Sequence, residues 1–253
     1  MRLGKYWRFS ATFFCFLIFG LGGMVLPLIV RPLLWIFVRN ALQRQRVGKQ
    51  MVHYCFRIFV EIMQLLGVIR YQVIGAENLA KTGQLILANH PTLIDVVLLI
   101  AFVKNADCVV KESLFKNPAT FGAITMAGYI TNDSPAKMLD KVARSLQQGN
   151  NVIIFPEGTR TTANEPLKLK RGAANIALTS KSDITPVIIN CSPPALSKEH
   201  RWYEAVDERV NLSIDIRDSI DISEFSQSER TSHSSRKLTR YLEWYFSEAL
   251  SLH

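Results

Sequence analysis

An uncharged run of 22 residues, Phe9–Val30, lies close to the start of this 253-residue chain. As a helix it would be roughly 33 Å long, which is enough to cross the hydrocarbon core of a bilayer. A cleaved secretory signal is the alternative, because basic residues precede the run. The run is long for a signal, however, and its apolar sequence continues to Val38 without a clear small-residue cleavage site. We therefore expect a retained membrane anchor.

The anchor contains residues that can interrupt a helix. Several glycines and two prolines, Pro27 and Pro32, could divide it into a re-entrant or interfacial hairpin instead of one span. Basic residues flank both ends of the anchor, and more of them follow it than precede it. Because basic residues are enriched on the cytoplasmic side of membranes, we expect the remainder of the chain to face the cytoplasm.

The sequence has a formal net charge of +9. A basic protein of this kind suits the anionic headgroups of a membrane surface. Nucleic acid is the rival partner, but the basic residues are not interleaved with aromatic residues that could stack on bases, so we expect no nucleic-acid binding. The four cysteines lie far apart with no paired spacing, so we expect neither a metal site nor a disulfide framework.

Apolar residues recur at three- and four-residue intervals between Val52 and Leu66, directly before Gly67. This spacing predicts an amphipathic helix. Its apolar stripe could pack in a protein core or lie in the membrane interface, and the sequence favours neither. We assign residues 1–67 to the anchor and this helix, and residues 68–253 to a single domain.

Short apolar runs alternate with helical patterns through that domain. We expect strands at residues 71–74, 84–88, 107–110, 151–155, 185–189 and 210–216, and helices at residues 91–102, 114–126, 136–148 and 238–249. The polar, Ser-rich residues 223–235 are expected to form a loop. Strands separated by helices predict an α/β fold with one mixed sheet and helices on its faces.

His90 directly follows one of these strands, Asp95 comes five residues later, and Pro91 is suited to the first position of a helix. Residues five apart diverge on a regular helix, so the two side chains can meet only if His90 precedes the helix and Asp95 reaches back. A neutral imidazole can take a proton from an alcohol, and a carboxylate on its other nitrogen fixes the tautomer. The alternative is that Asp95 complements the helix dipole and His90 caps the turn.

A second block, Phe155–Arg160, follows another strand and reads Phe-Pro-Glu-Gly-Thr-Arg. The carboxyl ends of strands form the usual binding edge of an open α/β sheet. Arg160 could bind a phosphate through two donors, and Gly158 lets the backbone approach a ligand closely. Glu157 could hold Arg160 in place or bind an acceptor hydroxyl. The alternative is a tight turn that carries a surface ion pair.

Together, the Asn89-His90-x4-Asp95 block and the Phe155–Arg160 block resemble the motifs of the glycerolipid acyltransferase family, whose best-known members are 1-acylglycerol-3-phosphate acyltransferases. The resemblance covers residues 69–192 and includes an apolar strand that carries a proline, Ile184–Val187. It implies acyl transfer from acyl-CoA or acyl-carrier protein to the hydroxyl of a lysophospholipid, which gives phosphatidic acid without an acyl-enzyme. Such a reaction requires no cofactor and no metal.

The resemblance also implies roles for individual residues. His90 would be the general base, Asp95 would orient it, and backbone N–H groups near Gly158 would stabilise the oxyanion. Four residues would form the acceptor-binding block: Glu157, Gly158, Thr159 and Arg160. Lys111, which follows the strand at residues 107–110, could add positive charge for a phosphate or could be a solvated lysine.

One departure from the family concerns the acceptor. Many phosphate-accepting members carry an arginine at the end of a glycine-containing block between the two motifs, whereas residues 128–133 contain none. Basic residues elsewhere could compensate for this charge: Lys111, Lys116, Lys137, Arg160, Lys168, Lys170 and Arg171.

Two other functions therefore stay open. One is an acyltransferase with another hydroxylated lipid acceptor, for example in an aryl-polyene pigment lipid pathway. The other is a membrane lipid-binding protein without turnover, although such a protein would need neither His90 nor Asp95. The family and the anchor together predict membrane localisation, at the bacterial inner membrane with the active site facing the cytoplasm.

Overall fold

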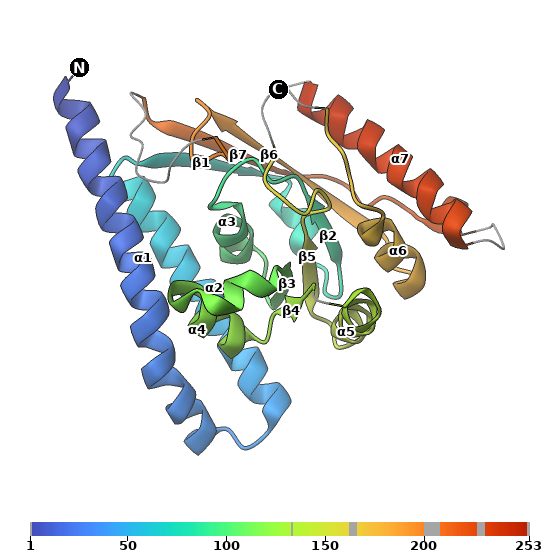
Figure 1. Cartoon of the computed structure of the whole chain (residues 1–253), viewed down its shortest axis with the longest axis horizontal. Coiled ribbons are helices and arrows are strands. Elements are labelled where there is room, and N and C mark those ends of the chain that lie inside the picture. Colours follow the sequence, from blue (N-terminus) through green and yellow to red (C-terminus); the bar gives the residue numbers. More distant parts are fainter. Residues whose placement is uncertain (1, 133, 162–165, 200–207, 227–230, 252–253) are drawn as a thin grey trace.

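The computed structural model describes residues 2–132, 134–161, 166–199, 208–226 and 231–251 (Figure 1). Within these residues the chain forms a seven-stranded sheet with the order β1-β7-β6-β2-β5-β3-β4. The strands, in sheet order, are β1 (Ile69–Ile74), β7 (Val210–Ile216), β6 (Ile184–Ser192), β2 (Leu85–Ala88), β5 (Asn151–Ile154), β3 (Ala106–Val110) and β4 (Ile130–Thr131). Neighbouring strands from β6 to β4 are parallel, and β7 is antiparallel to β6, so the sheet is mixed as predicted.

Helices cover both faces of the sheet (Figure 1). On one face lie α2 (Ala41–Leu65), α3 (Asp95–Phe102) and α4 (Pro118–Ala127), with α1 (Arg2–Phe37) packed outside them. On the other lie α5 (Pro135–Gln147), α6 (Arg171–Ser180) and α7 (Thr231–Ser251). Strand residues alternate between the two cores, so that Ile86 packs with the first group of helices and Leu87 with the second.

Helix α1 runs without interruption through Pro27 and Pro32, so neither proline divides the anchor. Its residues Gly4–Phe37 are long and apolar enough to cross a membrane, and only 17% of the most apolar window is buried. One of the glycines that the sequence suggested as helix breakers, Gly23, instead allows close packing between helices. A Cβ on Gly23 would stand 1.9 Å from the carbonyl oxygen of Ala119, so only a glycine lets α4 approach this closely.

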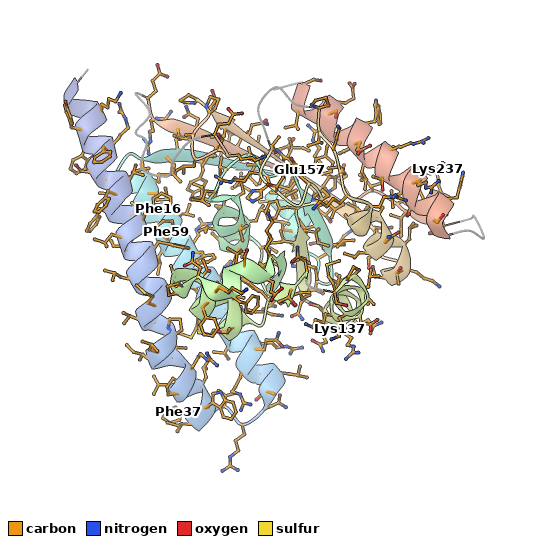
Figure 2. The ribbon with its side chains drawn as sticks, in the orientation of Figure 1. Phe16, Phe37, Phe59, Lys137, Glu157 and Lys237 are labelled. Atoms are coloured by element: carbon orange, nitrogen blue, oxygen red, sulfur yellow. The ribbon has the colours of Figure 1, made fainter. Side chains whose placement is uncertain are left out.

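Figure 2 labels Phe16 of α1 and Phe59 of α2, and it shows Phe37 at the far end of α1, away from the sheet. Helix α1 contacts α2 through Phe19, whose ring lies 5.2 Å from the Phe59 ring, centroid to centroid. Phe59 is buried in the core that the helices share with the sheet, and Phe37 is 77% exposed. The apolar stripe of α2 therefore packs mainly in the protein core, which decides the alternative that the sequence left open. Helix α2 is longer than predicted because Asn40 caps its first turn, accepting hydrogen bonds from the N–H groups of Leu42 and Gln43.

Three further sequence-based predictions differ from the structure. Helix α3 begins at Asp95 and not at Pro91, because the intervening residues form a turn held by the Asp95 side chain. The helix expected at 114–126 is a short 3-10 turn, Glu112–Lys116, followed by α4, which the Asn117 side chain caps. Part of the loop expected at 223–235 is helical, since Ser223–Phe225 is a 3-10 turn and α7 begins at Thr231.

Helix α6 and strand β4 have no counterpart among the predicted elements. Helix α6 contains small residues with a weak apolar period, such as Ala173 and Ala174, and its burial comes from packing against α5 and α7. Strand β4 is two residues long and depends on pairing with Val109 and Val110. Such elements exist because of tertiary contacts, and local sequence carries little signal for them.

A buried ion pair joins α2 to the sheet. Lys49 Nζ lies 2.8 Å from Asp107 Oδ2 of β3, and the two side chains are 2% and 3% exposed. The Ser145 hydroxyl of α5 also donates to Asp107 Oδ2. Burial lowers the pKa of the Lys49 ammonium below its ordinary value, and the Asp107 carboxylate opposes that change. Removing each charged group from water is unfavourable, and the attraction between the two groups offsets part of that cost.

Lys49→Met is expected to lower the free energy of unfolding by about 3–5 kcal/mol, because it leaves the Asp107 carboxylate buried without its cation. Chemical denaturation in detergent measures the effect. The control is Arg57→Ala, which removes an exposed ion pair with Glu61 and a cation–π contact with Phe102, and it should cost about 1–2 kcal/mol. Equal losses in the two variants would contradict a structural role for the buried pair.

Candidate active site

Sheet topology brings the two sequence blocks together. Strands β2 and β5 are parallel neighbours, with Leu87 paired to Ile154, so their carboxyl ends meet at one edge of the sheet. The loop after β2 contains His90, and the loop after β5 contains Glu157. The edge is where open α/β sheets hold their ligands.

His90 and Asp95 form the predicted pair. His90 Nδ1 lies 2.8 Å from Asp95 Oδ2, the Asp95 side chain is fully buried, and the His90 side chain is 18% exposed. A carboxylate can only accept, so Nδ1 carries the proton and Nε2 is left with a free lone pair. The arrangement is that of a general base whose open nitrogen a substrate hydroxyl can reach.

Several donors surround the buried carboxyl group of Asp95. Thr92 donates twice, from its N–H to Asp95 Oδ2 at 2.7 Å and from its hydroxyl to Oδ1. Burial raises the pKa of the Asp95 carboxyl above its ordinary value, and the hydrogen bonds from His90 and Thr92 oppose that rise. Thr92 is itself 1% exposed, so its hydroxyl has no competing water.

Glu157 of the second block and the neighbouring Thr161 form hydrogen bonds with the main-chain N–H and carbonyl of His90. Glu157 Oε1 accepts the His90 N–H at 2.9 Å, and the Thr161 N–H donates to the His90 carbonyl at 2.7 Å. The Thr161 hydroxyl completes the link by donating to the same Glu157 oxygen at 2.9 Å. Burial raises the pKa of the Glu157 carboxyl, and these donors oppose the rise. Glu157, which is labelled in Figure 2, is 9% exposed.

Two more contacts orient this loop. The ring of Phe155 lies 4.4 Å from the His90 ring, centroid to centroid, so it supports one face of the imidazole. Asn89 joins the loop to β6 by two hydrogen bonds, donating to the Ile189 carbonyl at 2.8 Å and accepting the Ile189 N–H at 2.7 Å. The imidazole is thus held by its ring face, by its Nδ1 and by its main chain.

Arg160 extends toward the loop after β6. Its Nη1 donates to the carbonyl oxygens of Leu196 at 3.0 Å and Ser197 at 2.7 Å. The Leu196 carbonyl also accepts the Leu93 N–H at 2.9 Å, and Leu196 itself has a φ of 54°. A leucine in the left-handed region is strained, and such strain persists where surrounding contacts impose it. Part of the guanidinium is therefore committed to protein carbonyls.

The other predicted site residues lie at the same edge without touching the His90–Asp95 pair. Gly158 adopts a φ of 68° and its N–H donates to the Phe155 carbonyl, so this N–H is unavailable to an oxyanion. Thr159 is exposed. Lys111 is exposed at the carboxyl end of β3, which pairs with β5. The structure thus brings His90, Asp95 and Glu157 together, and it leaves the roles of the remaining residues as predictions.

Sequence reasoning missed the supporting residues Thr92, Thr161 and Phe155 as parts of the site. Only Thr92 had a usable signal, since a hydroxyl between a histidine and an aspartate can donate to the carboxylate. Thr161 and Phe155 act through the main chain and the ring face of His90, which lies far from them in the sequence. Those contacts are visible only after the sheet is assembled.

A family model described as Acyltransferase matches residues 70–190. The Caenorhabditis elegans protein named "Putative 1-acyl-sn-glycerol-3-phosphate acyltransferase acl-1" is 31% identical to this chain over 195 residues. The match covers 72% of this chain and 71% of that protein. The chain belongs to the acyltransferase family.

A second sequence relative and one solved structure also resemble this chain. The 1-acyl-sn-glycerol-3-phosphate acyltransferase of Saccharomyces cerevisiae is 28% identical over 153 residues, which cover 57% of this chain and half of the yeast protein. The crystal structure of the 1-acyl-sn-glycerophosphate (LPA) acyltransferase PlsC of Thermotoga maritima has a TM-score of 0.76 at 20% identity, covering 99% of this chain and 98% of that one. The second likeness confirms the predicted fold, an α/β domain preceded by a helical segment.

In this acyltransferase, Thr92→Val is expected to move the acid limb of the pH profile of kcat to higher pH by up to about one unit. Loss of the hydroxyl donor raises the pKa of Asp95 and makes its carboxylate a stronger acceptor for His90. Both changes help the His90–Asp95 pair to take up a further proton, and a pair that has done so cannot act as the base. Acyl transfer measured across the pH range tests this. The control Thr179→Val, on the exposed side of α6, should leave the limb in place. If the acid limb of the pH profile is the same in Thr92→Val as in the unmutated protein, the Thr92 hydroxyl does not tune the His90–Asp95 pair.

Proposed function

We propose that the protein transfers a fatty acyl group from an acyl thioester to the free hydroxyl of 1-acylglycerol 3-phosphate, giving phosphatidic acid. The observation that carries this proposal is the His90–Asp95 pair, with Nδ1 held at 2.8 Å and Nε2 left open. The names of the yeast and nematode relatives support the same acceptor. An intact, well-supported pair of this kind counts against a lipid-binding protein without turnover.

The reaction follows from the geometry of that pair. His90 Nε2 removes the proton of the acceptor hydroxyl while its oxygen attacks the thioester carbonyl carbon. Asp95 stabilises the imidazolium that forms. Collapse of the tetrahedral intermediate breaks the carbon–sulfur bond, and the thiolate leaves with the proton that His90 carried. The products are the new ester and a free thiol, and no acyl-enzyme is formed.

A different hydroxylated lipid acceptor is the second candidate. The family's arginine between the motifs is absent here, and Asn132 follows β4 at that place. The Asn132 N–H donates to the Val110 carbonyl at 3.1 Å, and its side chain carries no charge. Acyl-CoA and acyl-carrier protein both remain in the proposal as donors.

Membrane association through α1 belongs to the same proposal. Large apolar residues line the outer surface of this helix, including Phe9, Phe13, Leu17 and Leu21. Burying such a surface in lipid is favourable, and the acceptor is itself a membrane lipid. The inner membrane and a cytoplasm-facing site stay predictions.

His90→Ala is expected to lower turnover by about a thousandfold or more, because the hydroxyl then has no base. Purified, detergent-solubilised protein is offered lysophosphatidic acid with palmitoyl-CoA or palmitoyl-carrier protein, and phosphatidic acid is measured. Thermal unfolding and vesicle binding serve as controls and should match those of the unmutated protein. Undiminished turnover in the variant would rule out the general base, and no phosphatidic acid from the unmutated protein would move the proposal to the other acceptor.

Arg160→Ala is expected to raise the KM for lysophosphatidic acid by about tenfold, the effect of losing one charge-assisted hydrogen bond. The KM for the donor should stay constant. Steady-state kinetics with each substrate varied in turn provide the measurement. Arg236→Ala, on the exposed side of α7, is the matched control. If Arg160→Ala changes only the stability, then its bonds to Leu196 and Ser197 are its whole role.

A further inference from the structure

The side chain of Lys170 lies across Gly158. A Cβ on Gly158 would stand 2.6 Å from Lys170 Nζ, 2.8 Å from Cε and 3.0 Å from Cδ. These atoms are the far end of a flexible, exposed side chain, so the distances place the amine over Gly158 without requiring a glycine there. The positive φ of Gly158 is what favours glycine at this position.

The main chain fixes the point from which this side chain extends. The Lys170 N–H donates to the Pro156 carbonyl at 2.8 Å, which ties the start of α6 to the second sequence block. The preceding residue, Leu169, is buried, and its N–H donates to Glu243 of α7 at 2.9 Å. The base of the lysine is thus held between the site loop and α7.

The Lys170 ammonium has no hydrogen bond or ion pair with any residue that the structure describes. Arg160, in contrast, already donates to two protein carbonyls through Nη1. Glu157, the residue next to Gly158, uses Oε1 to accept from His90 and Thr161. Among the described residues, a cation without a protein partner therefore lies over Gly158, next to Glu157, the residue whose carboxylate accepts the His90 N–H.

We infer that the Lys170 ammonium binds the phosphate monoester of the acceptor. This inference rests on the proposed function and names the contact that takes the place of the family's missing arginine. A phosphate monoester carries close to two negative charges and accepts strong hydrogen bonds from an ammonium. Lys170 is thereby a specificity-determining residue for phosphorylated acceptors.

The chemistry of the two substrates assigns this contact to the acceptor. In 1-acylglycerol 3-phosphate the free hydroxyl and the phosphate are on adjacent carbons, so a cation that binds the phosphate must lie near the base. In an acyl-CoA or an acyl-carrier protein, the pantetheine arm separates the phosphates from the reacting thioester. The loop under Lys170 contacts His90 directly through Glu157 and Thr161. The amine is therefore on the acceptor side.

Turnover kinetics test the inference first. Lys170→Met is expected to raise the KM for lysophosphatidic acid by about tenfold, with the donor KM unchanged, since one charge-assisted hydrogen bond is lost. Lys170→Arg, which keeps the charge, should recover part of the loss. The matched control Lys141→Met removes an exposed lysine of α5 and should leave both constants unchanged. An unchanged acceptor KM in Lys170→Met, or a rise confined to the donor KM, would overturn the inference.

Equilibrium binding separates this inference from the proposed function. The probes are hexadecyl phosphate and hexadecanol in the same detergent micelles, because neither needs turnover. Lys170→Met should bind hexadecyl phosphate about tenfold more weakly and hexadecanol equally well. If the unmutated protein makes no phosphatidic acid but shows this difference, the proposed acceptor fails and the phosphate contact stands. Equal binding of hexadecyl phosphate by the unmutated protein and the variant overturns the contact, whatever the turnover.

Discussion

Two hydrogen bonds to the main chain of His90 hold the site together. Glu157 accepts its N–H, and Thr161 donates to its carbonyl. Both bonds require the loops after β2 and β5 to emerge side by side, which the parallel pairing of those strands ensures. With the backbone fixed in this way, the imidazole needs only Asp95 and the ring of Phe155 to define its direction. The base is therefore positioned by side chains that the neighbouring strands β2 and β5 bring together.

Two buried carboxyl groups, those of Asp95 and Asp107, each need partners that offset the cost of removing a charge from water. Asp95 is fully buried, and Thr92 and His90 supply the donors that a buried carboxylate needs. Lys49 and Asp107 solve the same problem by pairing with each other where α2 meets β3. The first arrangement prepares a reactive group and leaves one nitrogen open. The second closes on itself and joins the N-terminal helices to the sheet.

Helix α1 presents two surfaces to two environments. Its inner side reaches α4 through Gly23 and contributes Ala11 and Cys15 to the core that it shares with the sheet. Its outer side is lined with exposed aromatic and aliphatic side chains. A helix of this kind can place the site close to lipid while remaining part of the folded body. In the proposed function, that position brings the acceptor headgroup to the edge where His90 and Lys170 lie.

By itself, the sequence determined the α/β class, most strands, the apolar N-terminal helix and the His90–Asp95 pair, because periodicity and motif spacing are local properties. It could not determine that Asp95 begins α3, that small residues would form α6, or that Arg160 would contact the loop after β6. Nor could it choose Lys170 among several basic residues. Those outcomes depend on residues far apart in the chain, and only the assembled sheet sets the distances between them.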